Sequence, residues 1–485
     1  MNVREWQRIC QIHTALFTLV IAHLVVAGTA FADEDTRKEW HYQSPNGLRR
    51  VVDQGDGKWL LHFPNGTTTD FEELERTKEY IQLRNLKNKN VQRLFADRGM
   101  SQKGGKGLFR KFADGKWVTP APNPSAGSAK SDYRIKLAYF VPTDRTPLPD
   151  YAQRIQAVMQ LVAEIFTADL RSKGYETEGP QFETKNGQMV VHLIKGDKTA
   201  REYNGLPVEK APQHPGLVAE AVHAQLGPQK SCAVVIFAET FEIGPSRKMF
   251  PGHVANAVAS PPNGGRAVCS AWMLRDEFCS ADPKRLRQLF FDATPVPGRT
   301  AYDHQGPNSP RFEFMEDGIG SVLHELGHIF GPTHHQSAPS NIMGGGFRNI
   351  RWNVGLKRNS RQQAGFSKEH GWLLMTSRFL NAKVDRTDNV PPTATMQLKL
   401  QGRSVMATIE AADDKELAYI SLVNVQKAKG RLLLDAKKLS GKTQTVRFRI
   451  DAREFTDRST EILMMVVDGG GNHRQIKRKL SEISR

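Results

Sequence analysis

The sequence has 485 residues, a length that suggests about three domains. Its formal net charge is +17, with 68 basic and 51 acidic residues, and it has only 4 cysteines. No C-x-x-C spacing occurs, which argues against a cysteine-ligated metal site, and no nucleic-acid-binding motif is evident. The basic residues are scattered without a compact patch that includes aromatic side chains. This pattern favours a solvated basic surface, and an acidic polymer at a cell surface is the alternative partner.

The first 32 residues are typical of a secretory signal peptide. Arg4 and Arg8 supply positive charge, residues 15–26 form an apolar stretch, and Ala30 and Ala32 place small side chains at the cleavage positions. The apolar stretch is too short for a membrane-spanning helix, although an uncleaved anchor is the alternative, and no other segment approaches that length. We therefore expect an exported protein that is secreted, periplasmic or bound to the cell surface, with no transmembrane helix after cleavage. Loss of this segment lowers the net charge by only one.

Residues 33–118 consist of short apolar runs separated by turns rich in Gly and Asn, which predicts a small β-rich module. The tripeptide Gly-Lys-Trp occurs at 57–59 and again at 115–117, which indicates either a duplicated hairpin or a coincidence. Residues 70–83 are compatible with helix or strand. A linker rich in Pro, Ser and Ala follows at 119–131, because its prolines cannot donate sheet hydrogen bonds and its small side chains bury little.

Residues 132–384 alternate between strand-like and helix-like patterns. This order predicts a twisted, largely parallel sheet with helices packed against it. The run at 232–238 is apolar throughout and is expected to be a central strand. The expected strands are 135–141, 189–194 and 232–238, and the expected helices are 151–173, 217–226, 316–330 and 367–380.

The helix expected at 316–330 carries the most informative motif, HELGHIFGPTH at residues 324–334. His324 and His328 are one helical turn apart on the same face, so both imidazoles can reach one metal ion. Glu325 follows the first histidine, where it can hold and deprotonate a water activated by the metal.

The chain must turn directly after this helix. Gly331 can adopt the left-handed conformation that ends a helix, and Pro332 cannot continue one. The turn can bring His334 back to complete a set of three histidines with one open position, as a catalytic zinc site requires.

Together these residues resemble the zinc signature of the metzincin peptidases, H-E-x-x-H-x-x-G-x-x-H followed by a methionine turn. The resemblance implies that His324, His328 and His334 bind one catalytic Zn²⁺ and that Glu325 is the general base. It also implies that the apolar side chain of Met343 packs beneath the metal site and does not bind the metal. Beyond the motif, residues 272–351 look like secreted, modular bacterial proteins of this type.

Two positions depart from the family pattern. Gly345 stands where some metzincins have a tyrosine, so no tyrosine should assist at this site. His335 follows the third histidine and is the alternative third ligand, although the spacing favours His334. A thermolysin-like arrangement would use Glu369 as the third ligand, but it would leave Gly331 and His334 without a role, and we reject it.

Residues 385–392 are polar, end in two prolines and mark a second linker. The remainder, 393–485, alternates in strand fashion at short intervals and predicts a β-sandwich that resembles bacterial immunoglobulin-like domains. Asp413, Asp414 and Asp468 lie in turn sequences. They could bind calcium, but turn residues without a metal are the favoured interpretation.

Cys10 is removed with the signal peptide, so Cys232, Cys269 and Cys279 remain. Three cysteines allow at most one internal disulfide. Cys269 and Cys279 are close enough in sequence to pair across a loop, and free buried thiols are an equally acceptable alternative.

The sequence thus predicts a multidomain protein. Its α/β metzincin-like catalytic domain, with a twisted, mostly parallel sheet and a zinc helix, lies between the β-rich module and the β-sandwich. The predicted function is zinc-dependent hydrolysis of a protein or peptide substrate that binds along an edge strand between residues 250 and 272. One alternative is a surface-binding or adhesion protein with a vestigial zinc site, and a second is zinc hydrolysis of a non-peptide bond.

Overall fold

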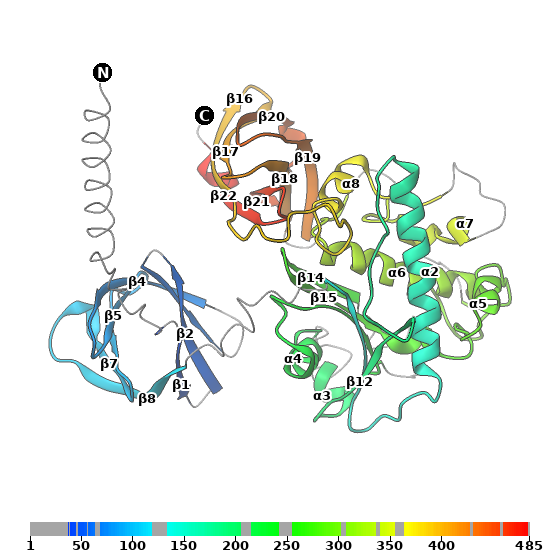
Figure 1. Ribbon diagram of the computed structural model, residues 1–485, viewed down its shortest axis with the longest axis horizontal. Helices are drawn as coiled ribbons and strands as arrows, with labels where there is room; N and C mark the ends of the chain where they lie inside the picture. The colour runs from blue at the N-terminus through cyan, green and yellow to red at the C-terminus, as the bar shows by residue number, and fades with distance from the viewer. Residues whose placement is uncertain are drawn as a thin grey trace, which may run out of the picture. The chain divides into compact units, whose positions relative to one another are not determined.

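The computed structural model divides into two compact units, residues 1–131 and 132–485, each of which is described by itself (Figure 1). The described residues are 37, 39–44, 47–55, 57–63, 68–118, 133–204, 215–241, 255–301, 307–335, 340–354, 363–426, 430–455 and 459–483. The expected signal peptide, Cys10 and the linker at 119–131 lie outside them. Among the described residues, none of the helices has the length and apolar character needed to cross a membrane.

The first unit contains a closed barrel of eight antiparallel strands, in which β1 pairs with both β2 and β8. Aromatic and aliphatic side chains that alternate along the strands, among them Trp40, Trp59 and Phe71, fill its interior. The β-rich prediction is therefore confirmed. The strands are β1 (Glu39–Ser44), β2 (Gly47–Gly55), β3 (Lys58–His62), β4 (Thr68–Arg76), β5 (Ile81–Asn85), β6 (Val91–Leu94), β7 (Arg98–Gln102) and β8 (Arg110–Val118).

The two Gly-Lys-Trp tripeptides do not form a repeated hairpin. Gly57 lies in the turn before β3 with a positive φ of 69°, whereas Gly115 lies inside β8. A Cβ at Gly115 would approach the Trp40 ring to 2.3 Å, so this glycine makes room for the barrel core. The ambiguous segment at 70–83 is strand in β4 and β5, with a tight connection between them.

The second unit begins with a five-stranded sheet in the order β12-β9-β13-β15-β14. The first four strands are parallel, and β14 pairs antiparallel with β15 at one edge. β13 lies between β9 and β15, the central position expected for an entirely apolar run. The strands are β9 (Lys136–Val141), β12 (Val191–Lys195), β13 (Ala233–Ala238), β14 (Ala255–Ser260) and β15 (Gly264–Ser270), and a separate short hairpin is formed by β10 (Thr184–Lys185) and β11 (Gln188–Met189).

Helices cover both faces of this sheet (Figure 1). Alternate residues of the strands pack against α2 (Tyr151–Ser172) and α6 (Arg311–Ile329) on one face. The intervening residues of the same strands pack against α3 (Ala200–Asn204) and α4 (Pro215–Leu226) on the opposite face of the sheet. The remaining helices are α5 (Pro283–Leu289), α7 (Arg351–Val354) and α8 (Lys368–Leu374).

The closing helix is shorter than expected. Instead of extending to residue 380, α8 ends at Leu374. The Thr376 hydroxyl donates to the Leu373 carbonyl at 2.7 Å, and this local bond competes with continuation of the helix. The buried side chain of Arg378 then reaches the segment that leads to the last part of the chain.

The last part of the chain forms two packed antiparallel sheets, β16-β17-β20 and β19-β18-β21-β22, around a shared apolar core. The predicted β-sandwich is confirmed at this level. The edge strand β22 (His473–Lys479) is rich in charge and lacks the apolar alternation of the other strands, so its sequence does not indicate a strand. The others are β16 (Thr393–Gln401), β17 (Ser404–Ala412), β18 (Leu417–Gln426), β19 (Gly430–Lys438), β20 (Thr443–Asp451) and β21 (Ser459–Asp468).

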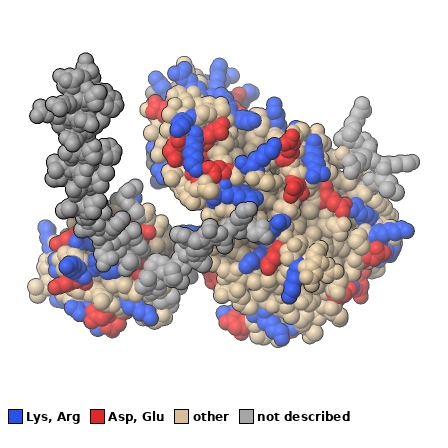
Figure 2. Space-filling view, viewed as in Figure 1, with Lys and Arg blue, Asp and Glu red and all other residues tan. Residues whose placement is uncertain are grey.

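Lys and Arg side chains are spread over the visible surface and interspersed with Asp and Glu (Figure 2). This view contains no single basic face, in keeping with the scattered basic residues of the sequence.

A pair of matched leucine truncations tests the barrel core. Leu83 is fully buried, whereas Leu108 is 88% exposed. We expect Leu83→Ala to destabilise the barrel by about 2–5 kcal/mol, because the truncation leaves a cavity. Leu108→Ala should change stability by less than about 0.5 kcal/mol. Hydrogen exchange of the barrel peptides measures both effects, and equal protection in the two variants would contradict this core assignment.

Candidate zinc site

The candidate zinc site is built on the C-terminal end of α6, the helix that carries the motif. Two acidic residues in the first half of this helix, which sequence reasoning did not single out, bind the segment that follows the motif in the chain. The Asp317 carboxylate accepts from Arg348 at 2.9 Å, and the Glu316 carboxylate accepts from the backbone N–H of Arg351 at 3.1 Å. Both acids are buried, and burial raises the pKa of Glu316 to about 7. These bonds hold the loop after the motif against the helix.

The helix ends where the sequence predicts. Gly331 follows it with a φ of 110°, in the region that favours glycine, and its N–H donates to the His328 carbonyl at 3.1 Å. Pro332 comes next, and its carbonyl accepts from Nδ1 of His328 at 2.7 Å. The turn therefore both reverses the chain and fixes the ring of the second histidine.

The turn brings the three predicted ligands together. Nε2 of His328 lies 3.1 Å from Nε2 of His324 and 3.2 Å from Nε2 of His334. Two nitrogens that bind one tetrahedral zinc ion at about 2.0–2.1 Å are about 3.3 Å apart, so this spacing fits the ion. Among the described residues, these three histidines form one of two groups whose ligand atoms are close enough to share a metal.

Hydrogen bonds determine which ring nitrogens face the centre. Nδ1 of His324 donates to the Ile342 carbonyl at 2.7 Å, as Nδ1 of His328 does to Pro332. With the proton on Nδ1, Nε2 keeps a lone pair for a metal. Burial lowers the pKa of His324 to about 4 and that of His328 well below its usual value, so both rings are neutral at neutral pH.

Glu325 lies beside the histidines and lines the same cleft. Its side chain is buried, and this burial raises its pKa to about 8. A divalent cation at the three histidines would favour the ionised carboxylate and oppose that shift. The arrangement therefore provides a carboxylate that a metal can keep charged in an otherwise apolar position.

Met343, the methionine expected under the metal, packs against the helix that carries the motif. It is fully buried, and a Cβ on Gly327 would come within 2.6 Å of its sulfur, so the glycine allows close contact between helix and methionine. The Met343 carbonyl accepts from the backbone N–H of His335 at 2.8 Å, which connects the methionine turn to the segment of the third histidine.

The alternative third ligand faces another direction. The ring of His335 lies edge-on to that of His370, with centroids 5.5 Å apart, and His335 lines a separate depression together with Glu369. His335 is not part of the three-histidine group, and Glu369 does not line the cleft of the histidines. The structure thus places His334, and neither alternative, with His324 and His328.

The histidines open into a cleft of about 440 Å³ between two parts of the second unit. The edge strand β14 provides one wall, in the interval where the sequence predicts a substrate-binding strand. The opposite wall comes from the β-sandwich, which sequence reasoning treated as a separate module. Its lining residues are Val423, Arg431, Leu463, Met465, His473 and Gln475.

Backbone contacts hold the sandwich against the site. The N–H of Leu433 in β19 donates to the His334 carbonyl at 2.9 Å. At Gly331 a Cβ would lie 3.3 Å from the His473 ring, so the turn also packs against β22. No motif in the sequence signals this contact, because strand periodicity identifies a sandwich but not the surface on which it docks.

The three described cysteines are free and buried. Cys269 therefore does not pair with Cys279. Burial raises the pKa of both thiols, that of Cys279 to about 12, and keeps them protonated.

Comparison with known proteins gives partial matches. No protein-family model matches the sequence. A Schizosaccharomyces pombe protein provisionally named a zinc metalloproteinase is 28% identical over 157 residues, which cover 32% of this chain and 23% of that protein. The matched segment is thus less than a quarter of that relative.

Among solved structures, wild-type OgpA from Akkermansia muciniphila aligns in two crystal forms with TM-scores of 0.43 and 0.45 at 14% and 15% identity. The alignments cover 71% of this chain and 92% and 91% of OgpA. An inactive OgpA in complex with an O-glycopeptide aligns with a TM-score of 0.43 at 12% identity, over 72% of this chain and 94% of that one. Likeness at this level does not establish a shared fold or activity.

Alanine variants of the two adjacent histidines test the ligand assignment. We expect His334→Ala to weaken zinc binding by more than the roughly 10- to 100-fold that loss of an outer-shell partner costs, because it removes a direct ligand. His335→Ala is the matched control and should retain one zinc per chain. Metal analysis after dialysis against a zinc buffer measures both, and the opposite pattern would make His335 the third ligand.

Proposed function

We propose that this protein is an exported zinc-dependent endopeptidase of the metzincin type. The convergence of three Nε2 atoms beside a buried glutamate, at the foot of an edge strand, is the observation that carries the proposal. The provisional name of the S. pombe relative agrees with it. The β-sandwich is proposed to be an immunoglobulin-like domain, in line with its two antiparallel sheets.

His324, His328 and His334 would hold the zinc ion. Zinc bound by three histidines lowers the pKa of water toward neutrality and polarises a carbonyl. The carbonyls of Ile342 and Pro332 keep the rings of His324 and His328 in the tautomer that presents Nε2 to a metal.

Glu325 is assigned the proton transfers. Its carboxylate accepts the proton of the attacking water and then passes it to the nitrogen of the departing amine. Its environment supports both roles, because burial raises the pKa of the carboxyl and favours the protonated form, whereas a cation at the histidines would favour the ionised form. The same burial limits competition from bulk water.

The substrate is proposed to be an extended peptide that pairs with β14. This strand pairs with β15 on one side and ends the sheet on the other. Its cleft-lining residues are mostly small, including Ala255, Ala257 and Ala259, which leaves room for main-chain pairing beside the histidines. The sandwich then faces the other side of the bound peptide and contributes to its selection.

Replacement of the glutamate tests the catalytic assignment. We expect Glu325→Gln to retain zinc but to lower peptide cleavage by at least about 10²- to 10⁴-fold, because the amide cannot accept the proton. Cleavage of casein or gelatin and zinc content are measured on the same preparation. Glu369→Gln is the control and should remain active.

The outcomes separate the alternatives. Equal cleavage by Glu325→Gln and wild type would contradict the assigned mechanism. Zinc bound by both proteins without cleavage of varied protein substrates would support the binding protein with a vestigial site. Activity on another acyl substrate alone would support hydrolysis of a non-peptide bond.

The role of the sandwich in substrate binding is tested through Arg431, which lines the cleft from β19. Loss of a hydrogen bond from a charged group costs about 1.5–3 kcal/mol, so we expect Arg431→Ala to lower kcat/KM by roughly 10- to 100-fold. Arg447→Ala, at an exposed position of β20, is the control. Unchanged kcat/KM in Arg431→Ala with a panel of peptides would argue against a substrate contact on this wall.

A further inference from the structure

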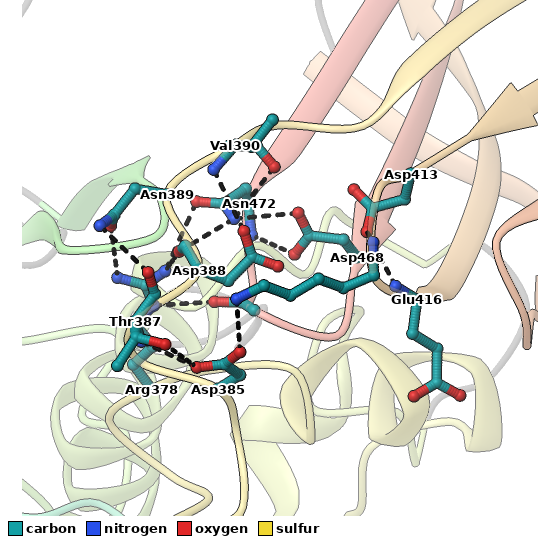
Figure 3. Close-up of polar contacts among 12 residues, drawn as sticks. Arg378, Asp385, Thr387, Asp388, Asn389, Val390, Asp413, Glu416, Asp468 and Asn472 are labelled. Atoms are coloured by element: carbon teal, nitrogen blue, oxygen red, sulfur yellow. Dashed lines mark hydrogen bonds and ion pairs between the residues drawn. The ribbon is translucent and has the colours of Figure 1, made fainter. Parts of the chain in front are cut away.

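A second cluster of potential metal ligands lies where the segment after α8 meets the sandwich. Asp388 comes from this segment, Asp413 from the connection between β17 and β18, and Asp468 from the end of β21. One carboxylate oxygen from each lies within 4.8 Å of the others. Figure 3 shows the three side chains turned toward one another. Their exposed fractions are 2%, 9% and 0%, respectively.

Two cations lie near the cluster, and their hydrogen bonds and ion pairs go to groups other than its three carboxylates. Lys415 forms an ion pair with Asp385 at 2.8 Å. Arg378 is buried and donates to the Gly470 carbonyl at 2.7 Å and to the Asp388 backbone carbonyl. Among the described residues, none of the three clustered carboxylates forms an ion pair with Lys, Arg or His. Lys415 interacts electrostatically with Asp388, but within this described region the three buried acids have no direct ion-pair partner.

One buried oxygen in the cluster has no hydrogen-bond partner. Oδ1 of Asp413 accepts the backbone N–H groups of Lys415 at 2.9 Å and Glu416 at 2.8 Å. Oδ2 of the same carboxylate is buried and receives no hydrogen bond. Leaving a buried carboxylate oxygen unpaired is costly unless a ligand satisfies it.

The other two carboxylates are held in place and keep free lone pairs. Asn472 donates to both oxygens of Asp468, at 2.8 and 2.9 Å, and Oδ1 of Asp388 accepts the Val390 N–H at 3.1 Å. Each carboxylate oxygen has two lone pairs, so one hydrogen bond leaves capacity for a cation. Burial, and then the charges of Asp388 and Asp413, raise the pKa of Asp468 to about 6.

The loop after β21 has the shape that the cluster requires. A Cβ on Gly470 would lie 2.5 Å from Cβ of Asp388 and 3.0 Å from its Oδ2. Only glycine allows the segment of Asp388 to approach Asp468 this closely. The close contact between the two segments therefore depends on glycine at position 470.

We propose that Asp388, Asp413 and Asp468 form a calcium site that connects the segment after α8 to two loops of the sandwich. The ligands offered are all carboxylate oxygens, which suit a hard cation and not zinc. Calcium is favoured over magnesium, because calcium accepts irregular cages of protein oxygens whereas magnesium usually keeps several waters. The sequence alone favours turns without a metal for the aspartates of the sandwich. The proposed calcium site includes two of them, Asp413 and Asp468, adds Asp388 as a ligand and omits Asp414.

The test uses the full chain, stripped of metal on a chelating resin and then reloaded with one equivalent of zinc. We expect it to bind one calcium ion in a titration calorimeter. Calcium at about 100 times its Kd should raise Tm by on the order of 5 °C, because the ion binds only the folded state. Failure to bind calcium, or an unchanged Tm at millimolar calcium, would overturn the proposal. An equal response to magnesium would overturn the choice of ion.

Two adjacent asparagine variants localise the effect. Asp413→Asn should lose at least tenfold in calcium affinity and most of the shift in Tm. Without calcium it should be at least as stable as wild type, because one like charge is removed from the cluster. Asp414→Asn, the same change at the next, exposed residue, should respond to calcium as wild type does. Retained affinity in Asp413→Asn would overturn the site, and unchanged zinc content in all three proteins separates this result from the zinc site.

Discussion

The reversal of the chain after α6 is the constraint on which the candidate site depends. A helix alone can present two histidines to one ion, but the third must come from a segment that returns to the same face. Gly331 makes this return possible through its positive φ, and the Pro332 carbonyl then fixes the ring of His328. The segment of Ile342 and Met343 supports the same region, because Met343 packs against Gly327 and the Ile342 carbonyl accepts a hydrogen bond from His324. Backbone carbonyls therefore orient two of the three ligand rings.

The β-sandwich belongs structurally to this centre. The sandwich contacts the segment of the third histidine through the hydrogen bond between Leu433 and His334, and its last strand packs against Gly331. It also forms one wall of the cleft. The cluster of Asp388, Asp413 and Asp468 lies at the same junction between the two parts. A cation bound there would offset the repulsion among three buried acids and stabilise the position of the sandwich. We thus propose two metal sites in the second unit. Zinc at the histidines would serve hydrolysis, and calcium at the aspartates would hold the sandwich in position.

Much of this architecture follows from local patterns in the sequence. The alternation of apolar runs gives the parallel strands, and the spacing of His324, His328 and His334 around Gly331 gives the histidine cluster, because both depend on residues close in sequence. The contacts between distant segments could not be predicted in this way. The charged side chains of the edge strand β22 obscure the alternation of apolar and polar residues that identifies a strand. The wall of the cleft formed by the sandwich depends on how two surfaces from distant parts of the chain fit together. The acid cluster unites residues 80 positions apart, and nothing in the turn sequences distinguishes Asp413 from the exposed Asp414.

The most direct measurement of the central claim is a crystal structure of the purified protein with diffraction data collected on both sides of the zinc absorption edge. Our account predicts one strong anomalous peak among Nε2 of His324, His328 and His334, with Glu325 beside it and an open position facing β14. A zinc-loaded crystal without a peak there, or with the peak at His335 and His370, would contradict the account.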